Sequence, residues 1–141
     1  MSFVKFTPKQ YAAFTGKGKP KNRGPKIPRP PSPGEEALAA QLAAHKIPFE
    51  REVKFSPGRR YRLDFVLKRP LRITAGVASR GLAVEVDGGL WNNGRHIRPA
   101  GVMEDMRKLN LAAKEGYIVL RYATDMIKSG EAIIDIMEQL K

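Results

Sequence analysis

Two stretches of sequence determine the fold: Arg62-Leu63-Asp64-Phe65-Val66-Leu67 and Leu82-Ala83-Val84-Glu85-Val86-Asp87-Gly88-Gly89. Both are rich in the branched and aromatic residues that favour β-strands. The second is almost continuously apolar over 82–86, which is typical of a strand buried on both faces, so we expect it to be central in its sheet. Each stretch nevertheless carries acidic residues, which are costly on a buried strand unless they are paired or hold a metal ion.

The order of the elements follows from hydrophobic spacing and turn residues. Ser32-Pro33-Gly34-Glu35 has the signature of a capping box, so we expect a helix from there to about His45. The pattern predicts strands at 53–55, 60–67, 82–86 and 117–122, and helices at 102–115 and 125–140. The predicted fold is α/β, with a mixed central sheet flanked by helices in the order helix, three strands, helix, strand, helix. Along 60–67 we expect strict alternation, with Tyr61, Leu63, Phe65 and Leu67 on one face and Arg62, Asp64 and Val66 on the other.

The charge of the chain indicates a polyanionic partner. It carries 26 Lys and Arg against 14 Asp and Glu, a net charge of +12 over 141 residues. Residues 1–31 contain basic residues, many prolines and no acid, so we expect an extended N-terminal arm there and one domain over 32–141. No apolar stretch is long enough to span a membrane, and the absence of cysteine fits a cytoplasmic location.

Asp64 and Glu85, on neighbouring predicted strands, are candidate metal ligands. Two adjacent carboxylates repel each other, and a cation relieves that repulsion. Mg²⁺ prefers oxygen ligands and keeps several waters, so these acids and the Val86 carbonyl would suffice, with Mn²⁺ as a possible substitute. A basic chain with acids among its strand residues therefore indicates a metal-dependent nuclease acting on the DNA backbone. The alternative, for these two acids and for Asp87, is ion pairing with Arg60, Arg62 or Arg121, or a place on an edge strand.

Four further residues are candidates for catalysis. Glu35 shares the inward face of the first helix with two leucines, although a capping-box role alone would explain it. Asp87 follows Glu85 and precedes a glycine pair that could bend it inward. His96 could act as a general base, and Lys108 could orient the attacking water or simply pair with Asp105. Arginines suited to binding phosphates are Arg59, Arg60, Arg62, Arg69, Arg72, Arg80, Arg95 and Arg98.

Taken in order, these residues resemble the PD-(D/E)xK nuclease superfamily. Glu35, Asp64 and Glu85-Val86-Asp87 correspond to its acidic motif. Arg59-Arg60-x-Arg62-x-Asp64-Phe65, Val84-Glu85-Val86-Asp87-Gly88-Gly89-x-Trp91, Gly94-Arg95-His96 and Asp105-x-x-Lys108-x-Asn110 resemble small phage and bacterial endonucleases related to the very-short-patch-repair endonuclease. The resemblance covers about 32–141. It implies a restriction-endonuclease-like core and Mg²⁺-dependent hydrolysis of DNA, with Asp64 and Glu85 as ligands and Glu35 in an outer shell.

One position departs from the superfamily pattern. The lysine usually found two residues after the glutamate is Asp87 here. Either Lys108 takes that role, or His96 serves as the base, or the metal alone activates the water. We expect an endonuclease directed by DNA structure, such as a nick, mismatch or branch, in phage or bacterial DNA processing or repair. The alternatives are a dimeric Holliday-junction resolvase, an inert DNA-binding protein on a nuclease fold, and a ribosome-associated basic protein.

Overall fold

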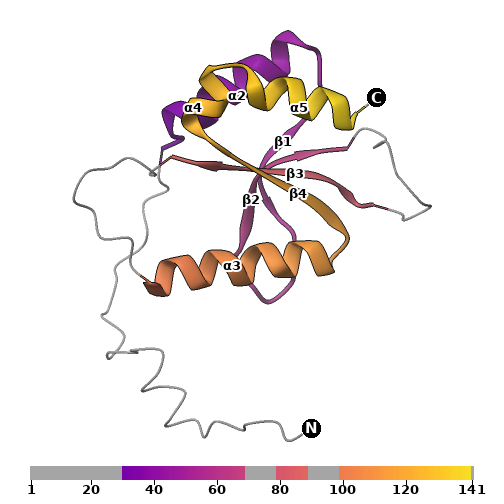
Figure 1. Ribbon diagram of the computed structural model, residues 1–141. Coiled ribbons are helices and arrows are strands. Elements are labelled where there is room, and N and C mark those ends of the chain that lie inside the picture. The colour runs from indigo at the N-terminus through magenta and orange to yellow at the C-terminus, as the bar shows by residue number, and fades with distance from the viewer. Residues whose placement is uncertain (1–29, 69–78, 89–98, 141) are drawn as a thin grey trace, which may run out of the picture. The chain divides into compact units, whose positions relative to one another are not determined.

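The computed structural model describes residues 30–68, 79–88 and 99–140 (Figure 1). The residues from Pro31 onward belong to one compact unit. The predicted arm therefore lies almost wholly outside the described residues, as do parts of the two loops that flank the strand at 81–87. The fold below is that of the compact unit alone.

The elements of this unit follow the order helix, three strands, helix, strand and two helices. They are α2 (Pro33–Ala44), β1 (Glu50–Lys54), β2 (Arg62–Leu67), β3 (Gly81–Asp87), α3 (Pro99–Lys114), β4 (Tyr117–Ala123), α4 (Thr124–Lys128) and α5 (Glu131–Gln139). The sheet has the order β1-β2-β3-β4, with antiparallel pairing up to β3 and parallel pairing between β3 and β4. The α/β fold with a four-stranded mixed sheet is thus confirmed, and β3 is an interior strand as its apolar run predicts.

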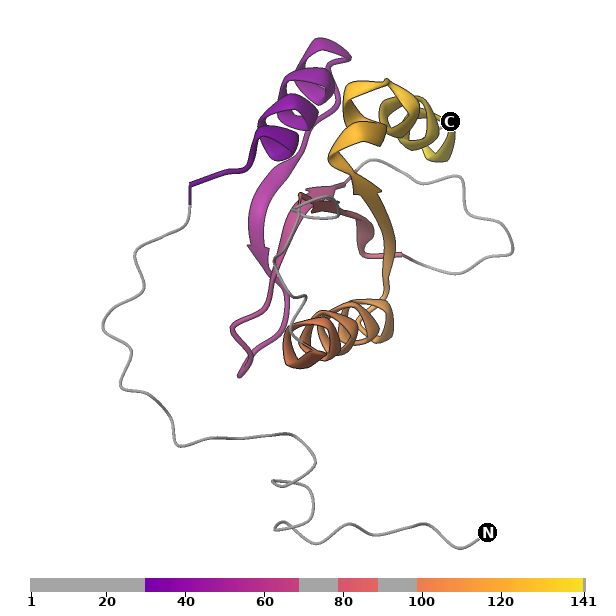
Figure 2. The same cartoon turned by 60° about the vertical axis from the view of Figure 1, so that its left-hand side comes forward.

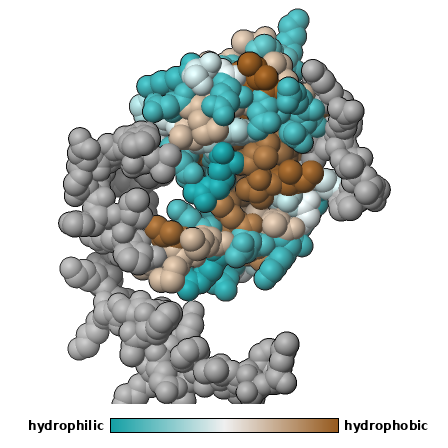
Figure 3. All heavy atoms as spheres, viewed as in Figure 1, coloured by the Kyte–Doolittle hydropathy of each residue, from teal (hydrophilic) through white to brown (hydrophobic). Residues whose placement is uncertain are grey.

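Helices cover both faces of the sheet. Helices α2, α4 and α5 lie on one face, and α3 lies on the other (Figures 1 and 2). The first face packs Leu38 and Leu42 of α2 against Phe65 and Val84 of the sheet. The second face has a smaller core whose buried members are Phe55, Leu63, Val66, Ala83 and Ala112. Hydrophobic residues are visible at the surface between the two layers of helices, where the edge strand β4 runs (Figure 3). Ile118 of β4 is 40% exposed.

The strict alternation predicted along 60–67 is wrong. Phe65 packs on the face of α2, whereas Leu63, two residues earlier, packs on the face of α3. The neighbouring strand β1 has a left-handed residue here, since Glu52 has φ of 52° and lies between the Arg51–Phe65 and Val53–Leu63 pairs. The left-handed residue of β1 thus lies opposite Asp64, the position at which the side chains of β2 change face.

The single helix predicted at 125–140 is also wrong, because it is two helices. Helix α4 ends at Lys128, and α5 begins after Gly130, whose φ of 86° is left-handed. A residue in that conformation cannot continue a right-handed helix, and glycine adopts it without a steric penalty. The apolar spacing runs through the break because Ile127 and Ile133 pack into the same core.

The start of α2 confirms the predicted capping box. The backbone N–H of Glu35 donates to Ser32 Oγ at 3.3 Å, and the N–H of Ser32 donates to Glu35 Oε2 at 3.4 Å. Gly34 brings this helix end close to the sheet, because a Cβ there would lie 2.6 Å from Thr124 Oγ1 and 3.0 Å from Val86 Cγ1. The first turn of α2 therefore lies against the carboxyl end of β3.

Candidate active site

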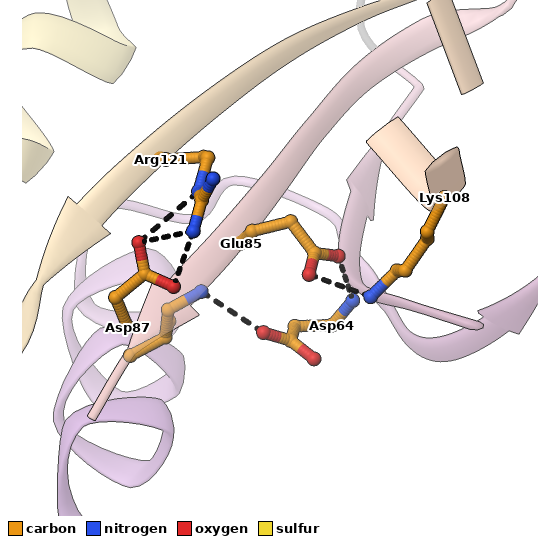
Figure 4. A network of polar contacts seen from close by, with 6 residues as sticks. Asp64, Glu85, Asp87, Lys108 and Arg121 are labelled. Carbon is orange, nitrogen blue, oxygen red and sulfur yellow. Dashed lines mark hydrogen bonds and ion pairs between the residues drawn. The ribbon is translucent and has the colours of Figure 1, made fainter. Parts of the chain in front are cut away.

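The candidate site lies where β2 and β3 stop pairing. Their ladder joins Phe65–Leu67 to Leu82–Val84, although β2 reaches back to Arg62 and β3 runs on to Asp87. At the end of the ladder two acidic side chains replace backbone partners. The N–H of Asp64 donates to Glu85 Oε1 at 3.0 Å, and the N–H of Val86 donates to Asp64 Oδ2 at 2.9 Å. The reciprocal bonds hold both carboxylates at this fork (Figure 4).

Lys108 of α3 completes the cluster. Its Nζ donates to Glu85 Oε2 at 2.6 Å, and the two side chains are only 16% and 11% exposed. The sequence left open whether Lys108 pairs with Asp105 on its own helix or reaches the strand acids. Its ammonium group lies at the acids (Figure 4). We call Asp64, Glu85 and Lys108 the fork cluster.

The fork cluster has two acidic side chains and only one cation. Burial raises the pKa of Glu85 above its ordinary value of 4.5, and the nearby Asp64 carboxylate raises it further. The Lys108 ammonium acts in the opposite direction and favours the ionised form. Two carboxylates and one cation therefore share a site in which Glu85 is buried and ionisation is costly.

Asp87 and Glu35 have partners of their own. Asp87 accepts two hydrogen bonds from Arg121, from Nε at 3.1 Å and from Nη2 at 2.9 Å, and so forms the ion pair that the sequence offered as an alternative. Figure 4 shows the Asp87 carboxylate turned toward Arg121, on the side away from Lys108. Glu35 is engaged in the capping box and lies 3.9 Å from Arg51. Among the described residues, neither acid makes a hydrogen bond or an ion pair with a member of the fork cluster.

The structure describes only some of the residues that were predicted to bind phosphates. Arg59, Arg60 and Arg62 are exposed near the start of β2. Arg80 is paired with Glu115 at 3.3 Å and its guanidinium lies 5.0 Å from the centre of the Tyr117 ring. The other predicted residues lie outside the described residues, namely Arg69, Arg72, Arg95, His96 and Arg98.

Two cations on α3 were not among the predicted site residues. Arg107 and Lys114 lie beside a pocket that Arg59 and Tyr61 also line. Their spacing was a usable signal, because residues seven apart lie on one side of a helix after two turns. Recognising the pocket additionally required knowing that α3 lies next to the turn between β1 and β2.

Three findings concern likeness to known proteins, groups that could hold a metal ion, and membrane-spanning helices. A comparison of the chain with family models, with curated proteins and with solved structures finds no significant match. Across residues 30–68, 79–88 and 99–140, no group of three or more His, Cys, Asp or Glu is arranged to hold a metal ion. In the same ranges, no helix is both long and apolar enough for a membrane crossing.

Proposed function

We propose that this chain is a metal-dependent DNA endonuclease of the PD-(D/E)xK type, built on a restriction-endonuclease-like core. The observation that carries the proposal is the fork cluster. Asp64 and Glu85 come from adjoining strands, meet where the ladder ends, and are joined there by the Lys108 ammonium. A structural sheet needs no acids at that point, because ordinary backbone pairing could continue through it.

The donor set of the cluster fits Mg²⁺ or Mn²⁺. Each carboxylate accepts N–H bonds but offers about four lone-pair sites, so acceptor capacity remains on Asp64 and Glu85. Two carboxylates completed by water, with the Val86 carbonyl as a further candidate, are enough for Mg²⁺. Burial and the repulsion from Asp64 raise the pKa of Glu85, and a bound dication would relieve that repulsion. Such an ion would supply charge neutralisation at a phosphate and a more acidic bound water.

Lys108 is the candidate for the lysine missing after Glu85. It stands on α3 instead of β3, but its Nζ is held beside Glu85 at 2.6 Å. There it can donate hydrogen bonds to a water or to a phosphate oxygen, and its positive charge favours the negative charge that develops during hydrolysis. Arg121 and Asp87, beside the cluster, would keep the end of β3 rigid through their paired hydrogen bonds.

One observation favours a second candidate, an inert DNA-binding protein. Lys108 already compensates Glu85 in the structure, so the ion pair could be purely structural. The net charge of +12 would serve either function, since it attracts DNA whether or not the strand is cut.

The test is nicking of supercoiled plasmid with Mg²⁺ or Mn²⁺. We expect D64N and E85Q to abolish nicking and K108M to reduce it by about 10²-fold, the usual effect of losing one group that stabilises developing charge. E50Q is the matched control, because Glu50 forms an exposed ion pair with Lys68 at the same 2.6 Å. Full activity of D64N and E85Q would refute the site. A wild type that binds DNA but never cuts it, across metals and substrates, would establish the second candidate.

A further inference from the structure

A pocket of about 270 Å³ lies between α3 and the turn that joins β1 to β2. The turn passes beside α3 in both ribbon views (Figures 1 and 2). The proposed cleavage chemistry makes no use of this pocket. It is lined by Arg59, Tyr61, Arg107, Asn110, Leu111 and Lys114.

Half of the lining residues are cations, which favours an anionic ligand. Arg59 comes from the turn side, and Arg107 and Lys114 come from one side of α3. The carboxylate of Glu104 borders this group, accepting from Arg107 Nη1 at 3.2 Å and from the hydroxyl of Tyr61. One acid against three cations leaves the pocket positive, which suits phosphate oxygens.

The remaining lining favours a flat, partly polar ring. The Tyr61 ring is held in place by stacking on Phe55, with centroids 6.5 Å apart and planes inclined by 15°. The Arg59 guanidinium lies 6.0 Å from the centre of the Tyr61 ring, at the outer limit of a cation–π contact, so a base can displace it at little cost. Leu111 adds apolar surface, and the Asn110 amide can both donate to and accept from a base edge. The lining therefore favours a ligand with phosphate groups and a flat ring that has a polar edge, which is a nucleotide.

We propose that this pocket binds one unpaired nucleotide of a DNA strand, with its base against Tyr61 and its phosphates at Arg59, Arg107 and Lys114. The volume is just below the range of about 300–1,000 Å³ for small-molecule sites, so the pocket has room for no more than one nucleotide unit. The proposal rests on the proposed nuclease function. It names the class of substrate, which is DNA with one nucleotide outside the base stack.

The position of the pocket links it to the fork cluster. Tyr61 precedes Asp64 by three residues, about 10 Å along an extended strand. Arg107 is adjacent in sequence to Lys108, which contacts Glu85. Measured along the axis of a duplex, about 10 Å spans roughly three nucleotides of one strand. An unpaired nucleotide in the pocket would therefore direct cutting to a bond a few nucleotides away.

The test measures binding without cleavage. Fluorescence anisotropy in the presence of EDTA compares a fully paired short duplex with the same duplex carrying one unpaired nucleotide. K114A is compared with K128A as a matched control. Both lysines are exposed and lie at the end of a helix, but Lys128 lies on α4, at the opposite face of the sheet. Y61L tests the stacking surface, and N110D, at an exposed position of α3, tests the pocket if Y61L does not fold.

The expected results separate phosphate binding from base binding. Wild type should prefer the duplex with the unpaired nucleotide, and Y61L should lower that preference about tenfold. K114A should weaken binding of both DNAs and reduce the salt slope by about one, whereas K128A should not. N110D should lower affinity for the unpaired nucleotide.

Any of three results would overturn the proposal. Wild type could bind both DNAs with equal affinity, K114A could behave as K128A does, or Y61L and N110D could both retain the preference. Competition by inorganic phosphate as strong as that by a nucleoside monophosphate would overturn it as well. Preferential binding without cutting would refute the nuclease but leave the pocket, and cutting without preference would refute only the pocket.

Discussion

Replacing Lys108 with methionine should destabilise the protein in a strongly pH-dependent manner. The substitution keeps a side chain of similar length but removes the cation beside Glu85. Glu85, buried and next to Asp64, would lose the ammonium that favours its ionised form. Removing one partner of a buried ion pair leaves an uncompensated charge, which is the costly way to break such a pair.

The magnitude follows from burial. The Lys108 and Glu85 side chains are 16% and 11% exposed, so little water is available to screen or solvate the remaining charge. We expect K108M to lower the free energy of unfolding by about 3 kcal/mol, the lower end for a buried pair, because the Asp64 N–H still donates to Glu85. The Lys68–Glu50 pair has the same 2.6 Å separation but side chains that are 66% and 53% exposed. K68M should therefore leave the unfolding midpoint essentially unchanged.

The sign of the pH dependence follows from the pKa of Glu85. Burial and Asp64 raise this pKa in the folded state, and losing Lys108 raises it further, because the ammonium acts to lower it. Between the unfolded and folded pKa values the native state binds more protons, so stability falls as pH rises. The K108M penalty should be absent below the unfolded pKa and complete above the folded one.

Urea unfolding over a pH series, from about pH 4 to about pH 8, measures this dependence. K108M combined with E85Q should recover most of the lost stability at neutral pH, since the buried charge is then gone. A K108M penalty that is constant with pH would contradict the reasoning. A K108M effect as small as that of K68M would contradict it as well.

Three further substitutions test the fold around the site. Y122F removes a hydroxyl that donates to Asp135 Oδ2 at 2.6 Å, and should cost about 1–2 kcal/mol in urea unfolding. Because burial and this hydrogen bond raise the pKa of Tyr122, an alkaline absorbance titration of Y122F should lack one of the late-ionising tyrosines of the wild type. G130A places a Cβ at a left-handed φ of 86° and should lower stability by about 1–2 kcal/mol in thermal unfolding. G34A would put a Cβ 2.6 Å from Thr124 Oγ1 and should cost about 1–3 kcal/mol, a loss that a second change, T124A, should reduce.

The order of the elements could be predicted from the sequence because it depends on short-range features. The capping box of α2, the left-handed Gly116 after α3 and the apolar run of β3 are each contained within a few residues. Local sterics and hydrogen bonding determine such features wherever they occur in a fold. The same reasoning missed the end of α4, since apolar spacing alone does not register the backbone angle at Gly130.

The candidate site could be predicted only as a set of residue types. That Asp64 and Glu85 belong to adjoining strands follows from the pattern, and both do lie at the fork. Which partner each polar group takes did not follow, because Lys108 and Arg121 come from segments more than twenty residues away from Glu85 and Asp87. Such choices depend on how α3 and β4 pack against β3.

The sequence by itself therefore determined an α/β chain with a central strand, acids on neighbouring strands and a strong positive charge. Only the tertiary structure decided where the β2–β3 ladder ends, which acid Lys108 contacts, and that α3 and the β1–β2 turn enclose a pocket. The physical reason is range: propensity and periodicity act over one element, whereas a fork, an ion pair and a pocket form between elements that only folding brings together.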